Sequence, residues 1–199
     1  GADTGVTILR LIPNALTLLR LLLALPVGWL ILHEQFAPAL AVGIVAGLTD
    51  AVDGWLARRL NAYSRFGAAL DPIADKTLMF VVFISLAMVG LVPWLVAAVV
   101  IIRDLVILAG ATAYHGLIDE LELEPTALSK SNTFVQIGYC ILVLAGVLLP
   151  AIPEALLIAS ALLVIAVSVI SGIDYVISWS RRAMSMRAGG GARRRKERN

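Results

Sequence analysis

The chain has 199 residues, the length of one domain, and 60% of them are hydrophobic against 15% charged. With a mean hydropathy of +0.92, this composition excludes an ordinary water-soluble globular domain and is typical of an integral membrane protein. The net charge is +2, and the single cysteine excludes a disulfide framework or a cysteine-rich metal site.

Apolar runs separated by polar or proline-containing breaks predict an all-α integral membrane protein, a bundle of six transmembrane helices, since about 20 such residues cross the bilayer core. In chain order the helices are expected over residues 14–32, 37–60, 66–89, the residues after Pro93 up to 114, 129–149, and the residues after Pro153 up to 180. The first is too long for a removed signal peptide and lacks a small-residue cleavage site, so it is expected to stay in the membrane. The acidic segment 115–128 belongs in water.

Three parts of the chain follow from this pattern. Residues 1–13 are expected to form an N-terminal surface segment with a short helix lying on the membrane, and residues 14–180 the transmembrane domain. Residues 181–199 hold eight of the sixteen basic residues and read as a flexible tail that is attracted to anionic lipids. Since basic residues gather on one side, the positive-inside rule places both termini and that side in the cytoplasm. A nucleic-acid role is not favoured, because no aromatic residues are interleaved and no binding fold is evident.

Four aspartates fall at membrane depth, where each ionised group costs about 2.5–3.5 kcal/mol and therefore points to a function. On the helix expected over 37–60, positions i, i+3, i+4, i+7 and i+8 are Asp50, Asp53, Gly54, Ala57 and Arg58. On the next helix, positions i, i+4 and i+8 are Gly67, Asp71 and Asp75. Each set lies on one helical face, and the short loop between the helices makes them antiparallel neighbours whose faces can meet.

Facing carboxylates repel one another unless cations fill the space between them. Carboxylate oxygens favour hard cations such as Mg²⁺, Mn²⁺ or Ca²⁺, and Arg58 can donate a fork of hydrogen bonds to phosphate oxygens. Such a set suits phosphoryl transfer, which depends on positioning and on neutralising charge. The structural alternative is a group of plain ion pairs at the cytoplasmic interface. Four acids on two complementary faces favour the metal site over that alternative.

These residues resemble the CDP-alcohol phosphatidyltransferase family, whose pattern is D-x2-D-G-x2-A-R-x8-G-x3-D-x3-D. All eight fixed positions match: Asp50, Asp53, Gly54, Ala57, Arg58, Gly67, Asp71 and Asp75. The similarity extends from residues 12–17 through Arg103 and Asp104 to residues 129–133. Only the two ends of the chain fall outside it.

The resemblance implies a dimer of six-helix chains with a site open to the cytoplasmic half of the membrane and holding two divalent ions, Mg²⁺ or Mn²⁺. It implies that Asp50, Asp53 and Asp71 bind the metals and that Asp75 assists them and acts as the general base. The cytidine diphosphate part of CDP-diacylglycerol is expected against Gly54, Ala57, Arg58 and Gly67. Asn14 and Thr17 are nucleotide neighbours by the same resemblance, with a helix cap and a packed hydroxyl as the structural alternative.

The acceptor alcohol is expected to meet Arg20, Arg103 and Lys130, the basic residues near helix depth outside the motif. For Arg103 the alternative is a structural pair with Asp104. Residues 101–104 and 123–133 look most like the cardiolipin synthases of the family, which use phosphatidylglycerol. Phosphatidylglycerophosphate synthases, which use glycerol 3-phosphate, are the runner-up; they tend to carry Arg-Glu at the first place and two lysines where this chain has Lys130 and Asn132.

Two other classes of protein remain open from the sequence. A cation transporter would also use intramembrane carboxylates, but it does not need the glycines and arginine of a nucleotide site. A structural membrane scaffold would predict that metal has no effect on stability. Asp174, near the end of the last predicted helix, is expected to be structural.

Overall fold

The structure is a computed structural model. It describes the chain at residues 18–19, 21–60, 65–115 and 127–196, with side chains at 18–19, 21–48, 76–110 and 131–178. Every regular element within these ranges is a helix: Leu21–Leu32, then α2 (Phe36–Leu60), α3 (Arg65–Met88), α4 (Trp94–His115), α5 (Ala127–Leu148) and α6 (Glu154–Lys196). The prediction of an all-α chain is confirmed for this part of it.

Two of the turns have the hydrogen bonds of Schellman motifs, and both lie where the sequence predicts a break between helices. At the end of Leu21–Leu32, the Gln35 amide donates to the carbonyl of Leu30, and Glu34 takes a positive φ of 58°. At the end of α3, the Leu91 amide donates to Leu86 and Gly90 takes φ 77°. A residue in the left-handed region closes a helix in this way, and glycine is the residue that adopts it without strain.

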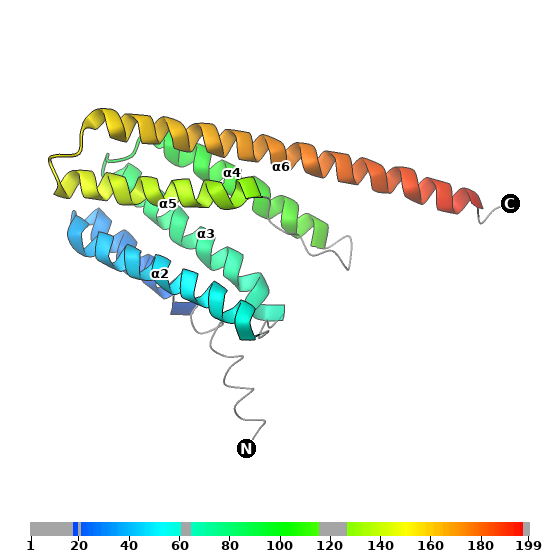
Figure 1. The fold of residues 1–199 in the computed structure, drawn as a ribbon, viewed down its shortest axis with the longest axis horizontal. Helices are drawn as coiled ribbons and strands as arrows, with labels where there is room; N and C mark the ends of the chain where they lie inside the picture. Colours follow the sequence, from blue (N-terminus) through cyan, green and yellow to red (C-terminus); the bar gives the residue numbers. More distant parts are fainter. Residues whose placement is uncertain (1–17, 20, 61–64, 116–126, 197–199) are drawn as a thin grey trace, which may run out of the picture.

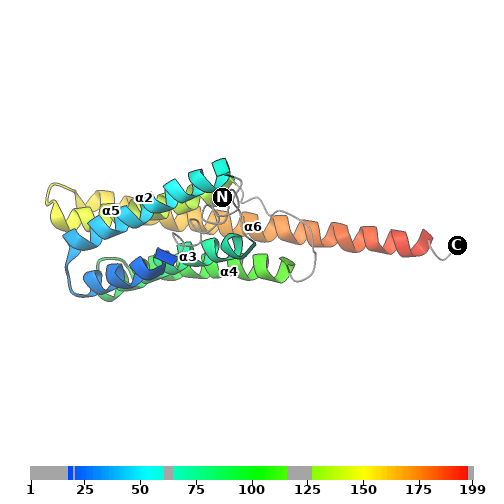
Figure 2. The ribbon, with the colours of Figure 1, turned by 90° about the horizontal axis from the view of Figure 1, so that it is seen from below.

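The helices form a bundle from which the end of α6 projects (Figures 1 and 2). Helix α6 packs against α4 and α5, α5 also packs against α2, and α3 packs against α4. The interior is apolar and includes Ile31, Phe83, Leu86 and Val100, all fully buried. Helix Leu21–Leu32 can lie close to α3 because Gly28 has no side chain; a Cβ there would stand 2.5 Å from Val81 Cγ1.

Two of the described helices are long and apolar enough to cross a membrane, over Ser131–Leu148 and Glu154–Ser178. Shorter apolar helices lie at Leu21–Leu32, Phe36–Leu48 and Lys76–Met88. Large apolar side chains cover the outside of the bundle, as Phe134 shows at 81% exposure. These features are consistent with a membrane protein, and the six crossings stay a prediction.

Helix α6 differs from its predicted extent. We expected the last helix to end near residue 180, whereas α6 continues to Lys196 past three consecutive glycines. Alanine, methionine, arginine and lysine are strong helix formers, and they surround the glycines here. The flexibility and the cytoplasmic location of the basic residues stay predictions.

Candidate functional site

The motif residues lie on the two helices that their spacing predicts. Asp50, Asp53, Gly54, Ala57 and Arg58 belong to α2, and Gly67, Asp71 and Asp75 to α3. Their side chains lie outside the described part of the chain, so their metal and nucleotide roles stay predictions. Among the described side chains, no group of three or more histidine, cysteine or acidic residues could hold a metal.

The predicted neighbours of the nucleotide and the acceptor are described only in part. Asn14, Thr17 and Arg20 lie outside the described residues. Lys130 is in α5, but its side chain is not among those described. Arg103 is fully described and lies in α4. It is therefore the residue from which the candidate acceptor site can be built.

Lys76 connects the aspartate-bearing turn of α3 to α4. Its Nζ lies 2.8 Å from Asp104 Oδ2, and the two side chains are 15% and 0% exposed. Lys76 directly follows Asp75, so their Cα atoms are about 3.8 Å apart. This ion pair therefore places Asp104 beside the turn of α3 that carries Asp75, the predicted general base.

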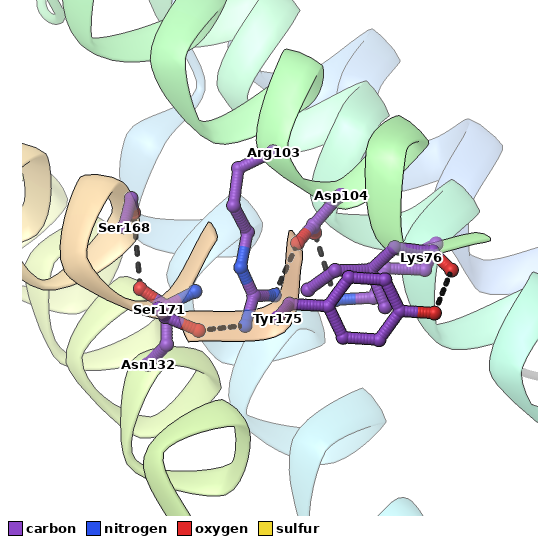
Figure 3. A network of polar contacts seen from close by, with 8 residues as sticks. Lys76, Arg103, Asp104, Asn132, Ser168, Ser171 and Tyr175 are labelled. Carbon is purple, nitrogen blue, oxygen red and sulfur yellow. Dashed lines mark hydrogen bonds and ion pairs between the residues drawn. The ribbon is translucent and has the colours of Figure 1, made fainter. Parts of the chain in front are cut away.

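Arg103 shares Asp104 with Lys76. Its Nη1 lies 2.6 Å from Asp104 Oδ1, and its Nη2 donates to Ser171 Oγ on α6 (Figure 3). The structural pair of Arg103 with Asp104 is thus present. The carboxylate of Asp104 thus meets two cations, Lys76 and Arg103.

Further hydrogen-bonding groups lie beside this ion pair, one turn away on α6. Ser168 Oγ donates to Asn132 Oδ1 at 3.0 Å, and both residues are fully buried (Figure 3). Asn132 Nδ2, and both polar side-chain atoms of Gln136 one turn along α5, have no partner in this part of the structure. We name six of these residues the polar cluster: Lys76, Arg103, Asp104, Asn132, Ser168 and Ser171.

Buried polar groups without partners are costly, because they lose their bonds to water without replacement. Gln136 has such buried groups without partners among the described residues, and the sequence analysis did not single it out. It lies inside an apolar run, and the only signal for it is its spacing of four residues from Asn132. The remaining members of the polar cluster on α6, Ser168 and Ser171, carry no sequence signal that separates them from packed hydroxyls.

A further contact fixes α4 against α6 next to the polar cluster. Tyr175 Oη donates to the Ile107 carbonyl at 3.1 Å. The tyrosine ring occupies space left by Gly110, where a Cβ would stand 2.8 Å from Tyr175 Oη. This contact adds to the packing of α4 against α6.

Two grooves lie between helices in the described part of the chain. The α2–α5 groove, about 330 Å³, is apolar and runs along α2 past Gly43 and Gly47 to Leu48, two residues before Asp50. The α4–α6 groove, about 430 Å³, includes Arg103 and Ser168 of the polar cluster in its lining. The two grooves share no lining residue.

Comparison with known proteins bears directly on these residues. The profile of the CDP-alcohol phosphatidyltransferase family matches residues 10–184. Cardiolipin synthase (CMP-forming) of Rattus norvegicus is 39% identical over 155 residues, which are 70% of this chain and 50% of the rat protein. The human protein of the same description is 37% identical over the same shares. This chain therefore spans about half the length of these two relatives.

A probable phosphatidylglycerophosphate synthase of Mycobacterium tuberculosis is 37% identical over 187 residues, which are 88% of this chain and 85% of that protein. The resemblance seen in the motif is thereby confirmed, including the likeness to the cardiolipin synthase branch. The chain belongs to the CDP-alcohol phosphatidyltransferase family of enzymes.

Proposed function

We propose that this protein transfers the phosphatidyl group of CDP-diacylglycerol to a hydroxyl of phosphatidylglycerol, giving cardiolipin and CMP. The observation that carries the choice of acceptor is the fully buried neutral amide of Asn132, which stands where phosphatidylglycerophosphate synthases tend to carry a lysine. The likeness to the rat and human cardiolipin synthases supports it. The reaction would occur in the membrane, on the cytoplasmic side and in a homodimer, as the family resemblance implies.

On the donor side, Asp50, Asp53, Asp71 and Asp75 would hold two divalent ions, Mg²⁺ or Mn²⁺. A donor set made of carboxylates on two helices fits such hard cations. The ions, when bound, neutralise charge on the diphosphate. Arg58 donates hydrogen bonds to phosphate oxygens, and Gly54, Ala57 and Gly67 leave room for the cytidine.

Asp75 takes the proton of the acceptor hydroxyl as the oxygen attacks the phosphorus of the phosphatidyl group. A new P–O bond forms, the bond to the CMP oxygen breaks, and CMP leaves with the electron pair. Arg58 stabilises the negative charge that develops on the phosphate oxygens. The contact between Lys76 and Asp104 helps Asp75, because it fixes the turn that carries the base.

The α2–α5 groove supports the assignment of the donor lipid. It is apolar and ends just below the turn of α2 that begins the motif. An acyl chain of CDP-diacylglycerol lying there would keep its head group at Asp50 and Asp53. Gly43 and Gly47 keep this groove open, since neither has another side chain within 4 Å of where a Cβ would stand.

The neutral amide of Asn132 supports phosphatidylglycerol over glycerol 3-phosphate. A phosphodiester carries one negative charge. A phosphomonoester carries about 1.5 to 2 negative charges at pH 7 and would need a further cation. Asn132, which offers a neutral amide here, stands where the runner-up synthases tend to carry a lysine. Arg20 and Lys130 are proposed to complete the acceptor site from the helix ends.

The runner-up function is phosphatidylglycerophosphate synthesis from glycerol 3-phosphate, which the M. tuberculosis relative favours. The test supplies the purified chain with CDP-diacylglycerol, Mg²⁺ and one acceptor at a time. We expect cardiolipin with phosphatidylglycerol and little product with glycerol 3-phosphate. Phosphatidylglycerophosphate as the main product would refute the choice of acceptor. The absence of CMP release with both acceptors would refute phosphatidyl transfer and favour the cation transporter.

A further inference from the structure

Two amide side chains of α5 are buried with hydrogen-bonding atoms left unmatched. Asn132 and Gln136 are both 0% exposed. Ser168 Oγ donates to Asn132 Oδ1, and Asn132 Nδ2 has no partner among the described residues. Gln136 Nε2 and Oε1 both lack a partner in the same part of the chain, so reversing this amide would not satisfy it. We name Asn132 and Gln136 the amide pair.

The amide pair weakens the folded protein as it stands. Each of its three unmatched atoms loses hydrogen bonds to water on burial without a replacement, which an apolar side chain would avoid. Asn132 and Gln136 are four residues apart on one helix, so they are neighbours on the same face of α5. Groups that lower stability in this way are typical of sites kept for function. One small ligand group can contact both amides.

The unmatched atoms are two donors and one acceptor, and both side chains are uncharged. Phosphate and ionised carboxylate oxygens only accept hydrogen bonds, so they would leave Gln136 Oε1 unmatched. A cation would leave the two amide nitrogens unmatched. An alcohol hydroxyl donates and accepts, so it can donate to Gln136 Oε1 while it accepts from Asn132 Nδ2. The amide pair therefore fits an uncharged group that carries a hydroxyl.

The amide pair adjoins the polar cluster next to the predicted base. Ser168, the partner of Asn132, is a member of that cluster (Figure 3). The cluster also contains Lys76, which directly follows Asp75 in the chain. Ser168 lines the α4–α6 groove as well, so the amide pair is one hydrogen bond away from a groove of the bundle. This position suits contact with the acceptor alcohol.

We propose that the amide pair binds the hydroxyl of the acceptor that does not react, and so determines the specificity for a glycerol head group. The terminal glycerol of phosphatidylglycerol has a primary hydroxyl, which attacks, and a secondary hydroxyl, which is left over. The secondary hydroxyl donates to Gln136 Oε1 and accepts from Asn132 Nδ2. The inference rests on the proposed function and deepens it, because it names the part of the acceptor that is recognised.

The first experiment removes the hydroxyl from the acceptor and the amide from the protein. The second acceptor is phosphatidyl-1,3-propanediol, which lacks only the secondary hydroxyl. A site that hydrogen-bonds a substrate hydroxyl discriminates against the analogue without it, so we expect the unmodified chain to prefer phosphatidylglycerol at least tenfold in kcat/KM. Gln136→Met keeps the length of the side chain and removes both polar atoms. It should reduce the preference to less than about threefold by lowering kcat/KM for phosphatidylglycerol alone, with KM for CDP-diacylglycerol changed less than about twofold.

Tyr139→Phe is the matched control on the same face of α5. Tyr139 is 4% exposed, and the substitution removes one oxygen while it keeps the ring that stacks on Phe83. The control should keep the preference of the unmodified chain. Gln136→Leu keeps the test valid if Gln136→Met fails to fold. An unmodified chain without the preference, or a preference that survives in the Gln136 variants, would overturn the inference.

Thermal denaturation without acceptor separates the alcohol from a resident water molecule. We expect the Tm of Gln136→Met to equal or exceed that of the unmodified chain, because an unmatched amide is replaced by an apolar group. A water held by the amide would be lost in the variant. A lowered Tm together with an unchanged preference between the two acceptors would therefore assign the amide to water and overturn the inference.

A second pair of acceptors separates the failure of this inference from the failure of the proposed function. Glycerol 3-phosphate has the same secondary hydroxyl, and 3-hydroxypropyl phosphate lacks it. If the chain uses glycerol 3-phosphate instead of phosphatidylglycerol, the proposed acceptor is wrong, and a preference lost in Gln136→Met still supports the amide pair. If the chain makes cardiolipin and Gln136→Met keeps the preference for phosphatidylglycerol over its propanediol analogue, the proposed function stands and this inference is overturned.

Discussion

Asp104→Asn removes the carboxylate that Lys76 and Arg103 share. Asparagine has nearly the same shape, so the change isolates the charge. Breaking a buried ion pair by removing one partner costs about 3–5 kcal/mol, because the remaining charge stays buried and unbalanced. For a chain of this size about 1 kcal/mol shifts Tm by about 2–4 °C, so a loss of about 6–20 °C is expected. Thermal denaturation in detergent, followed by the loss of the monodisperse peak in size-exclusion chromatography, measures it.

The same substitution has a second consequence for the choice of acceptor. The substitution removes one negative charge from the polar cluster, next to the cations Lys76 and Arg103. A unit charge at about 4 Å is worth about 4 kcal/mol at an effective dielectric constant of about 20. We therefore expect the ratio of kcat/KM for glycerol 3-phosphate to that for phosphatidylglycerol to rise at least tenfold. The kinetics are measured at a temperature below the lowered Tm.

Asp174→Asn is the matched control, since Asp174 is half-buried on α6 and outside the polar cluster. It should change Tm by less than 3 °C and leave the acceptor ratio as it is. Lys76→Met should cost less stability than Asp104→Asn, because it leaves the contact between Arg103 and Asp104 in place. An Asp104→Asn chain with unchanged Tm and an unchanged acceptor ratio would refute the reasoning about the shared carboxylate.

Three further predictions concern other parts of the bundle. Asp75→Asn should abolish turnover while Tm and CDP binding, measured by calorimetry, stay close to those of the unmodified chain; turnover within tenfold would exclude Asp75 as the base. Gly47→Leu, in the α2–α5 groove, should raise KM for CDP-diacylglycerol at least fivefold and leave KM for phosphatidylglycerol unchanged. Val45→Leu, outside the α2–α5 groove, should leave both KM values unchanged. Gly110→Ala should cost about 1–3 kcal/mol, seen as a lower Tm, because its Cβ displaces Tyr175. An unchanged Tm for Gly110→Ala, or equal effects of Gly47→Leu on both lipids, would contradict these assignments.

The sequence predicts helix ends well where proline, glycine or a polar turn interrupts an apolar run. The end of α3 at Gly90 and the start of α4 after Pro93 are examples, because both residues act on the local backbone. The predicted end of α6 was wrong by about sixteen residues. The prediction ended the helix where the apolar run ends, whereas residues of high helix propensity continue beyond that point. The motif aspartates were placed on the correct helices because their spacing is a local property.

The contacts of the polar cluster could not be predicted in the same way. Lys76 and Asp104 are 28 residues apart, and Arg103 and Ser171 are 68 residues apart. Such pairs depend on how α3, α4 and α6 pack, which helical periodicity does not determine. Sequence reasoning did raise the neighbouring pair Arg103–Asp104, which is present. It did not find Gln136, because one amide in an apolar run resembles a packed residue until its burial is known.

The most direct test of the proposed function follows two labels in one reaction. The purified chain is given CDP-diacylglycerol labelled in the cytidine and phosphatidylglycerol labelled in the terminal glycerol, with and without Mg²⁺. We predict that labelled CMP and labelled cardiolipin appear in equal amounts, and that both require the metal. Cardiolipin formed without CMP, or CMP formed without cardiolipin when phosphatidylglycerol is the only acceptor, would contradict the proposed function.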